Sequence, residues 1–154
     1  MSVSRDEFVK AFQFAWKRLQ DNRGDQELLN AYDDDARWTD VVLGADVGLV
    51  CMALDRLNSA KAKTERLEFS KGWLFVDALY VSNDTIWGTE PQKHFYPTKL
   101  SVLIENENRK HWDTELWKLA HIKADLKVLI GYDFGSQNGF YPVFTDGLER
   151  DENC

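Results

Sequence analysis

The sequence predicts a single α/β domain in which helices flank a central mixed sheet. Apolar residues recur at helical spacing near the N-terminus, and later runs are rich in aromatic and β-branched residues. A strand, a helix and a strand are then expected in succession between residues 100 and 132. The length of 154 residues fits one domain, which we expect to span 1–148 before a flexible tail at 149–154.

The first helix is expected to begin after Ser4. Ser4 and Glu7 have the spacing of a capping box, in which each residue satisfies a free backbone N–H group of the other. The apolar residues that fall on one stripe of this helix are Phe8, Ala11, Phe12, Ala15, Trp16 and Leu19. Gly24 is expected to help end it.

A second helix is expected to begin at Thr39 or Asp40 and to run to about Leu57, because apolar residues give this segment a broad hydrophobic face. Gly44 and Gly48 lower its helix propensity, and they can allow another element to approach closely.

Later segments alternate between strand and helix patterns. Residues 73–81 form an aromatic and β-branched run that predicts a strand, and 100–107 predict the next one. Residues 86–96 carry glycine and proline and predict an irregular loop or a short edge strand. A helix over about 109–124 and a strand over 126–132 follow. A strand, a helix and a strand in this order predict a parallel pair.

The composition argues against several classes of protein. No apolar run reaches the roughly 18 residues that cross a bilayer, so we expect no membrane partner. The N-terminus lacks a signal-peptide layout, which makes a cytoplasmic location the expectation. Cys51 and Cys154 form neither a disulfide framework nor a zinc pattern.

The net charge of -7 argues against non-specific coating of nucleic acid, because phosphate binding needs clustered Lys and Arg. Acidic residues concentrate between residues 21 and 40, whereas residues 93–127 are richer in base. Within 21–37 we expect a short helix or loop that ends in a solvated turn at Asp33, Asp34 and Asp35. Three adjacent aspartates rarely all point inward, so a metal site there is not favoured.

Two glutamates at the end of a predicted strand form the candidate site. Side chains alternate along a strand, so Glu105 and Glu107 project together while Asn106 points away. A divalent cation would relieve their repulsion, and Mg²⁺ prefers one or two carboxylates with water and phosphate oxygens. Asp77 is the expected third acid, because an acid inside a buried strand is costly unless it is paired or metal-bound. Asp84, at the end of that strand, is the second choice.

A structural explanation of the same residues stays open at this point. Glu105 and Glu107 also fit the solvated end of a strand, and Asp77 also fits a loop cap or an ion pair with Lys71. The histidines lack the spacing of metal ligands, which makes surface or capping roles the expectation for them.

This order of acids and elements resembles the PD-(D/E)XK nuclease family, which has the restriction-endonuclease-like fold. The resemblance covers about residues 70–132. Asp77 matches the first acid of the motif, and Glu105-Asn106-Glu107 matches the acid-x-Lys element. The sequence departs from the motif in having Glu107 at the usual place of Lys, and Val76 where a proline precedes the first acid.

The resemblance implies hydrolysis of DNA phosphodiesters with Mg²⁺ as cofactor. Asp77 and Glu105 would be the metal ligands, and Glu107 would orient the attacking water or act as base. An acid of the N-terminal helices, Glu7 or Glu27, is a further candidate for the site. The lysines that would replace the missing motif lysine are Lys99, Lys110 and Lys118.

A non-catalytic function is the alternative. An acidic protein of the immunity or anti-nuclease type would mimic nucleic acid or bind a basic protein partner. The charge of -7 and the missing motif lysine favour this alternative, whereas the three acids favour the nuclease. Geometry discriminates between them, because one cation cannot bridge Asp77 and Glu105 if their carboxylates lie more than about 8 Å apart or on opposite faces.

Overall fold

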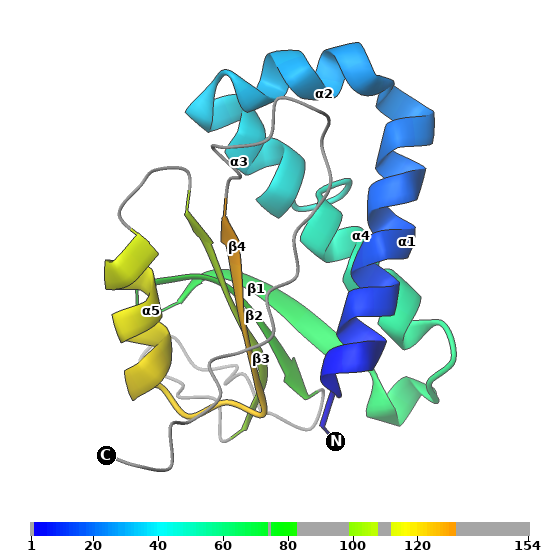
Figure 1. Cartoon of the computed structure of the whole chain (residues 1–154). Coiled ribbons are helices and arrows are strands. Elements are labelled where there is room, and N and C mark those ends of the chain that lie inside the picture. The colour runs from blue at the N-terminus through cyan, green and yellow to red at the C-terminus, as the bar shows by residue number, and fades with distance from the viewer. Residues whose placement is uncertain (1, 74, 83–98, 108–111, 132–154) are drawn as a thin grey trace, which may run out of the picture.

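Helices cover both faces of one open sheet in the part of the chain that the computed structural model describes, residues 2–73, 75–82, 99–107 and 112–131 (Figure 1). The helices of this part are α1 Arg5–Arg23, α2 Asp25–Tyr32, α3 Asp35–Leu43, α4 Leu49–Asn58 and α5 Trp112–His121, with a short 3₁₀ helix at Lys63–Glu65. The strands are β1 Leu67–Trp73, β2 Val76–Ser82, β3 Leu100–Glu107 and β4 Leu126–Gly131, in the spatial order β1-β2-β3-β4. The predicted α/β class is therefore confirmed.

Helix α1 forms as predicted. The Ser4 hydroxyl accepts the Glu7 N–H at 3.3 Å, and the Glu7 carboxylate accepts the Ser4 N–H at 2.9 Å, which completes the capping box. The six residues of the predicted stripe are all buried. Gly24 follows the helix with a φ of 77°, a conformation that glycine adopts at little cost.

The acidic segment forms helix α2 and a solvated turn, as predicted. Asp33, Asp34 and Asp35 are all exposed. The Asp34 carboxylate accepts the N–H groups of Ala36 and Arg37 at 3.0 and 3.1 Å, so it caps α3. These contacts give Asp34 a role in starting a helix.

The prediction of one helix from Thr39 or Asp40 to Leu57 is wrong. The chain forms two helices, because α3 ends before Gly44 and α4 begins after Gly48. A Cβ atom at Gly48 would collide with the backbone of Gly44. The two glycines thus allow a close approach between their own backbones, and the break in the helix lies there.

The predicted strand over residues 73–81 contains a turn. Strands β1 and β2 form an antiparallel hairpin in which Trp73 pairs with Val76. Phe75 lies in the turn with a φ of 69°, which is unusual for a bulky residue. The residues around this turn are apolar, so composition alone does not separate the two strands.

The second half of the sheet matches the prediction. Strand β3 has the expected bounds and pairs with β2 in antiparallel orientation, and β4 runs parallel to β3 after α5. The parallel pair is therefore confirmed. The predicted loop at 86–96, Asp84 and the tail at 149–154 lie outside the described residues.

The sheet separates two hydrophobic clusters. On one face, Tyr80, Val102 and Ile104 pack against the helices α1 to α4. On the other face, Leu103 packs with Leu119 of α5. Leu100 belongs to this second cluster, although strict alternation along β3 would place it on the same face as Val102. The register of β2 against β3 shifts between Tyr80 and Val81, and Val81 is the partner of Leu100, so the alternation is interrupted at this point.

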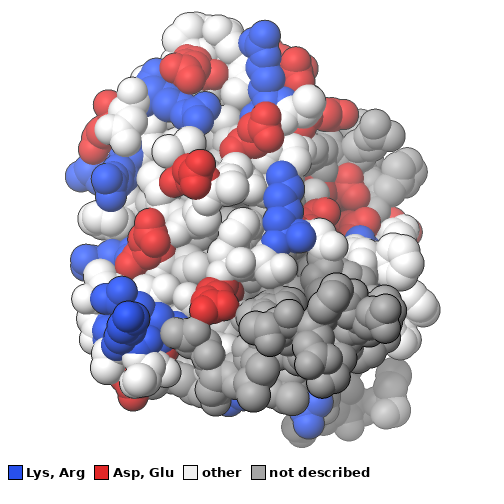
Figure 2. Space-filling view, turned by 180° about the vertical axis from the view of Figure 1, so that it is seen from behind, with Lys and Arg blue, Asp and Glu red and all other residues white. Residues whose placement is uncertain are grey.

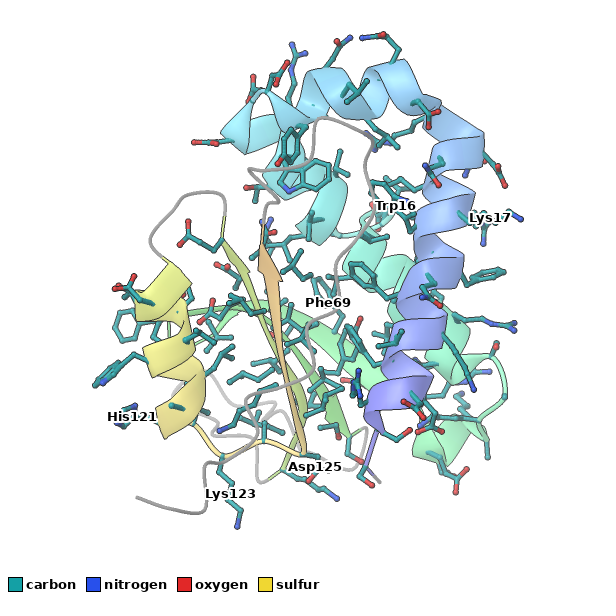
Figure 3. All side chains as sticks on the ribbon, in the orientation of Figure 1. Trp16, Lys17, Phe69, His121, Lys123 and Asp125 are labelled. Atoms are coloured by element: carbon teal, nitrogen blue, oxygen red, sulfur yellow. The ribbon has the colours of Figure 1, made fainter. Side chains whose placement is uncertain are left out.

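Side chains of α1 show the same division between core and surface (Figure 3). Trp16 points toward the interior, whereas its neighbour Lys17 points away from the protein. Among the described residues, no helix has both the length and the apolar composition that crossing a membrane requires.

Candidate functional site

Strand alternation places Asp77, Glu105 and Glu107 on the face of the sheet that α5 covers. Leu79 and Leu103, which have the same alternation as these acids, both pack in the cluster under α5. Strands β2 and β3 are in register with Ala78 opposite Ile104. One step further along each strand, Asp77 comes opposite Glu105.

Asp77 and Glu105 are held together by hydrogen bonds that cross between the two strands. The Asp77 N–H donates to Glu105 Oε2 at 3.2 Å, and the Asn106 N–H donates to Asp77 Oδ2 at 2.8 Å. Each carboxylate thus lies beside the backbone of the other strand. The structure brings these two predicted site residues together on one face.

Glu105 is fully buried, with an exposed fraction of 0%. Burial raises the pKa of its carboxyl group from 4.5 to about 7, although hydrogen bonds from Lys118 and from the Asp77 N–H oppose the shift. The neighbouring charge of Asp77 adds to the increase. Glu105 therefore changes protonation near neutral pH, where a proton and a metal cation would compete for it.

A lysine of α5 reaches the buried acid. Lys118 Nζ lies 3.0 Å from Glu105 Oε1 and donates to the Phe75 carbonyl at 3.0 Å, and it also forms an ion pair with Glu115. Burial lowers the pKa of Lys118, but hydrogen bonds to Glu115 and Glu105 outweigh it, so the pKa lies above its usual value. Lys118 is therefore a positive charge at neutral pH.

The other candidate lysines differ in position. Lys99 lies just before β3, at the end of the strand opposite to Glu105, and pairs with Asp125 at 3.4 Å. Lys110 lies outside the described residues. Of the two candidates that the structure describes, Lys118 is the one that contacts the predicted acids.

The remaining predicted acids lie apart from this pair or at its margin. Glu107 is half-buried at the end of β3, opposite Gly131 of β4. Glu7 is engaged in the capping box of α1, and Glu27 pairs with Arg23 at 3.5 Å. Helix α1 covers the other face of the sheet, so its acid does not join the pair.

Glu115 is a residue of the site that the sequence-based prediction missed. Its spacing of three from Lys118 on one helix indicates a contact between the two side chains. That spacing does not show which face of α5 meets the sheet. Glu115 therefore becomes recognisable as part of the site only when Lys118 is seen against Glu105.

Charge on the surface is mixed. Figure 2 shows Lys and Arg side chains beside Asp and Glu side chains over the described part of the face seen from behind. That part of the face therefore presents no broad surface of a single sign. In the described part of the chain, no group of three or more His, Cys, Asp or Glu side chains is arranged to hold a metal ion.

Comparisons of the chain with protein-family models, with curated proteins and with solved structures find no match. A functional assignment therefore depends on the contacts of the site itself. The contacts that matter most are those joining Asp77, Glu105 and Lys118, which come from two neighbouring strands and from the helix that covers them.

Proposed function

We propose that the chain is a metal-dependent nuclease with a restriction-endonuclease-like fold, and that it hydrolyses DNA phosphodiesters with Mg²⁺ held by Asp77 and Glu105. One observation carries this proposal. Asp77 and Glu105 lie side by side on neighbouring strands, and Lys118 places its ammonium group 3.0 Å from Glu105. Two acids and a lysine are the groups that the sequence resemblance implies, although the lysine comes from α5.

The order of elements supports the proposed fold. A helix comes first, an antiparallel pair carries the acids, and a further helix leads to a strand parallel to β3. The resemblance to the PD-(D/E)XK family predicts this order around its acids. Asp77 lies on β2 and Glu105 on the neighbouring strand β3.

The donor set of the site suits Mg²⁺, which is commonly bound by one or two protein carboxylates together with water and phosphate oxygens. A carboxylate offers about four acceptor positions, so a backbone hydrogen bond at Asp77 or Glu105 leaves room for a cation. When bound, the metal would polarise the phosphate and lower the pKa of a water molecule.

The chain's own residues would divide the remaining tasks. Asp77 and Glu105 hold and orient the cation, and Glu107 orients the attacking water. Lys118 takes the place of the missing motif lysine. Because its pKa is raised, Lys118 stays protonated and stabilises the negative charge that develops on the phosphate.

Cleavage of plasmid DNA in the presence of Mg²⁺ or Mn²⁺ tests this function. Asp77→Asn and Glu105→Gln keep the shape of each side chain and remove its charge, so each is expected to reduce the rate by about 10²-fold or more. Glu68→Gln is the matched control, since Glu68 is an exposed residue of β1. Cleavage at the wild-type rate by both site variants would contradict the assignment.

Binding of Mg²⁺ provides a readout that does not depend on cleavage. A ligand that binds only the folded state raises the melting temperature, and the increase is larger when the ligand binds more tightly at a given concentration. We therefore expect Mg²⁺ to raise the melting temperature of the wild type and to have a smaller effect on Asp77→Asn. Equal shifts for the two proteins would place the cation elsewhere.

One observation favours the non-catalytic alternative. Lys118 forms ion pairs with both Glu105 and Glu115, so the buried acids have a counter-charge without a metal ion. In that case the cluster is structural, and the acidic chain would bind a basic protein. This alternative predicts no cleavage by the wild type, and binding to a basic partner that weakens as salt is added.

A further inference from the structure

We propose that Trp117 and His121, two exposed residues of α5, form an aromatic platform that stacks the unpaired bases of single-stranded DNA. The inference rests on the proposed function where it makes single strands the substrate of the acid pair. The stacking itself can be measured without a metal ion and without cleavage.

Trp117 presents a large apolar ring to solvent. Its exposed fraction is 63%, and among the described large hydrophobic residues only Phe75 is more exposed, at 89%. The exposed Phe14 of α1 differs from both, because the Arg56 guanidinium lies over its ring at 4.7 Å from the centroid. A tryptophan ring gains much from burial against a partner, so Trp117 is the stronger candidate for a contact.

The two rings of the platform lie against each other and are held in place. Their centroids are 4.2 Å apart, with an angle of 36° between the ring planes. His121 Nδ1 lies 2.7 Å from the Trp117 carbonyl oxygen. Because a carbonyl oxygen only accepts, Nδ1 donates in this contact, and the imidazole is restricted to one orientation. Rings that are fixed beforehand lose little freedom when a base stacks on them.

The platform lies on the helix that covers the acid pair. Trp117 directly precedes Lys118, whose Nζ lies 3.0 Å from Glu105 Oε1. Lys118 Nζ also donates to the Phe75 carbonyl at 3.0 Å, so the turn that carries the exposed Phe75 ring lies against the same helix. A strand of several nucleotides that is held on the platform can therefore extend to the acids.

The end of α5 carries positive charge that complements a DNA backbone. Lys123 and Lys127 are exposed, and Lys127 Nζ lies 3.5 Å from the carbonyl oxygen of Ala120, the residue before His121. Figure 3 shows His121 and Lys123 pointing away from the protein at this end of the helix. The nearby Asp125 is paired with a lysine, Lys99, at 3.4 Å. Phosphates that join the stacked bases would meet these lysines.

Stacking on a surface ring selects single strands. The bases of a duplex are already stacked on one another, so an aromatic side chain on a surface reaches only bases that are unpaired. Tight binding of a duplex depends instead on many phosphate contacts from Lys and Arg, which the net charge of -7 does not favour. Two exposed rings beside a few lysines therefore fit a single strand better than a duplex.

The test measures binding of a fluorescein-labelled oligo-dT strand of about 12 nucleotides to the full chain, by fluorescence anisotropy in the presence of EDTA. Trp117→Leu keeps a large apolar side chain and removes the aromatic face. Loss of one stacking contact is expected to weaken binding by about fivefold or more. Trp117→Phe keeps a smaller aromatic face, and it is expected to bind with intermediate affinity.

Phe14→Leu is the matched control, because it makes the same kind of change at an exposed aromatic residue on the other side of the sheet. We expect it to bind the strand as the wild type does. The same oligo-dT strand annealed to oligo-dA is expected to bind the wild type less tightly than the single strand does.

Three results would overturn the inference: no binding of the strand by the wild type, equal affinity for strand and duplex, or equal affinity of Trp117→Leu and the wild type for the strand. Self-association that is lost in Trp117→Leu, without binding of the oligonucleotide, would assign this surface to a second copy of the chain and would overturn it as well.

The outcomes also separate this inference from the proposed function. If the wild type cleaves single-stranded DNA, Trp117→Leu should raise KM by about fivefold or more with little change in kcat, because the platform acts in binding. If the wild type binds the strand through Trp117 but cleaves no DNA, the proposed function fails and the platform stands. Cleavage by a wild type whose binding does not depend on Trp117 gives the reverse result.

Discussion

Glu105 is a fully buried carboxylate with support from several neighbours. The Asp77 N–H donates to one oxygen, and Lys118 lies beside the other. These contacts favour the charged form, but the loss of water around the group outweighs them and raises its pKa to about 7. Cation binding at Asp77 and Glu105 is the use that we propose for this buried acid.

The raised pKa predicts how stability depends on pH. The folded state binds the Glu105 proton more tightly than the unfolded state, whose value is near 4.5. The resulting stabilisation is fully present below about pH 4.5 and is lost as the pH rises through 7. Between about pH 5 and pH 8 the wild type should therefore lose about 2–3 kcal/mol of unfolding free energy relative to Glu105→Gln.

Urea unfolding of both proteins across this pH range measures the difference. Glu68→Gln removes an exposed glutamate of β1 and should follow the wild-type profile. Parallel profiles for the wild type and Glu105→Gln would mean that Glu105 has an ordinary pKa in the folded protein.

At the scale of elements, two glycines decide where the helical region is divided. The Gly48 N–H donates to the Gly44 carbonyl at 3.0 Å, and no side chain stands between the two backbones. Helices α3 and α4 can therefore leave this point in different directions while both contribute to the larger cluster. Val42 and Val50, one on each helix, are both fully buried as a result.

Gly48→Ala is expected to destabilise the protein. The added Cβ would meet backbone atoms of Gly44, which cannot move aside as a side-chain end can, so the connection between α3 and α4 must shift. Overpacking of this kind costs about 1–3 kcal/mol. The measurement is the midpoint of urea unfolding.

Gly131→Ala is the control for this prediction, because a Cβ at Gly131 has open space around it. We expect a change within about 0.5 kcal/mol for the control. Equal midpoints for Gly48→Ala and the wild type would show that the connection relaxes without cost.

At the scale of the whole molecule, each face of the sheet packs against its own hydrophobic cluster. Ile104 and Leu103 are consecutive residues of β3, both with 0% exposed surface, and they point into opposite clusters. Strand β3 is hydrogen-bonded to β2 on one side and to β4 on the other. Loss of packing on either face therefore disturbs the same central strand.

Ile104→Ala and Leu103→Ala are each expected to cost about 2–5 kcal/mol, the range for a buried large-to-small change. Because the strand is shared, we expect one cooperative transition in both variants, with coincident curves by tryptophan fluorescence and by circular dichroism. Leu29→Ala, at an exposed position of α2, is the control and should change little. Separate transitions for the two probes would mean that the layers unfold independently.

Local sequence patterns were sufficient to predict the structure of segments whose conformation depends on contacts between residues close together in the sequence. The capping box of Ser4 and the stripe of α1 depend on contacts three or four residues apart. Strand alternation likewise predicted that Glu105 and Glu107 share one face, whereas the antiparallel register that sets Asp77 opposite Glu105 came only from the structure. The nuclease function of these acids stays a prediction.

The sequence by itself determined the α/β class, helix α1, strand β3 and the parallel pairing of β3 with β4. Tertiary structure alone decided the pairing of Asp77 with Glu105, the place of Leu100 and the contact of Lys118 with Glu105. The physical reason is distance along the chain: Lys118 and the Phe75 carbonyl are 43 residues apart. Their contact depends on how α5 packs over the sheet, and periodicity in a single segment carries no information about that packing.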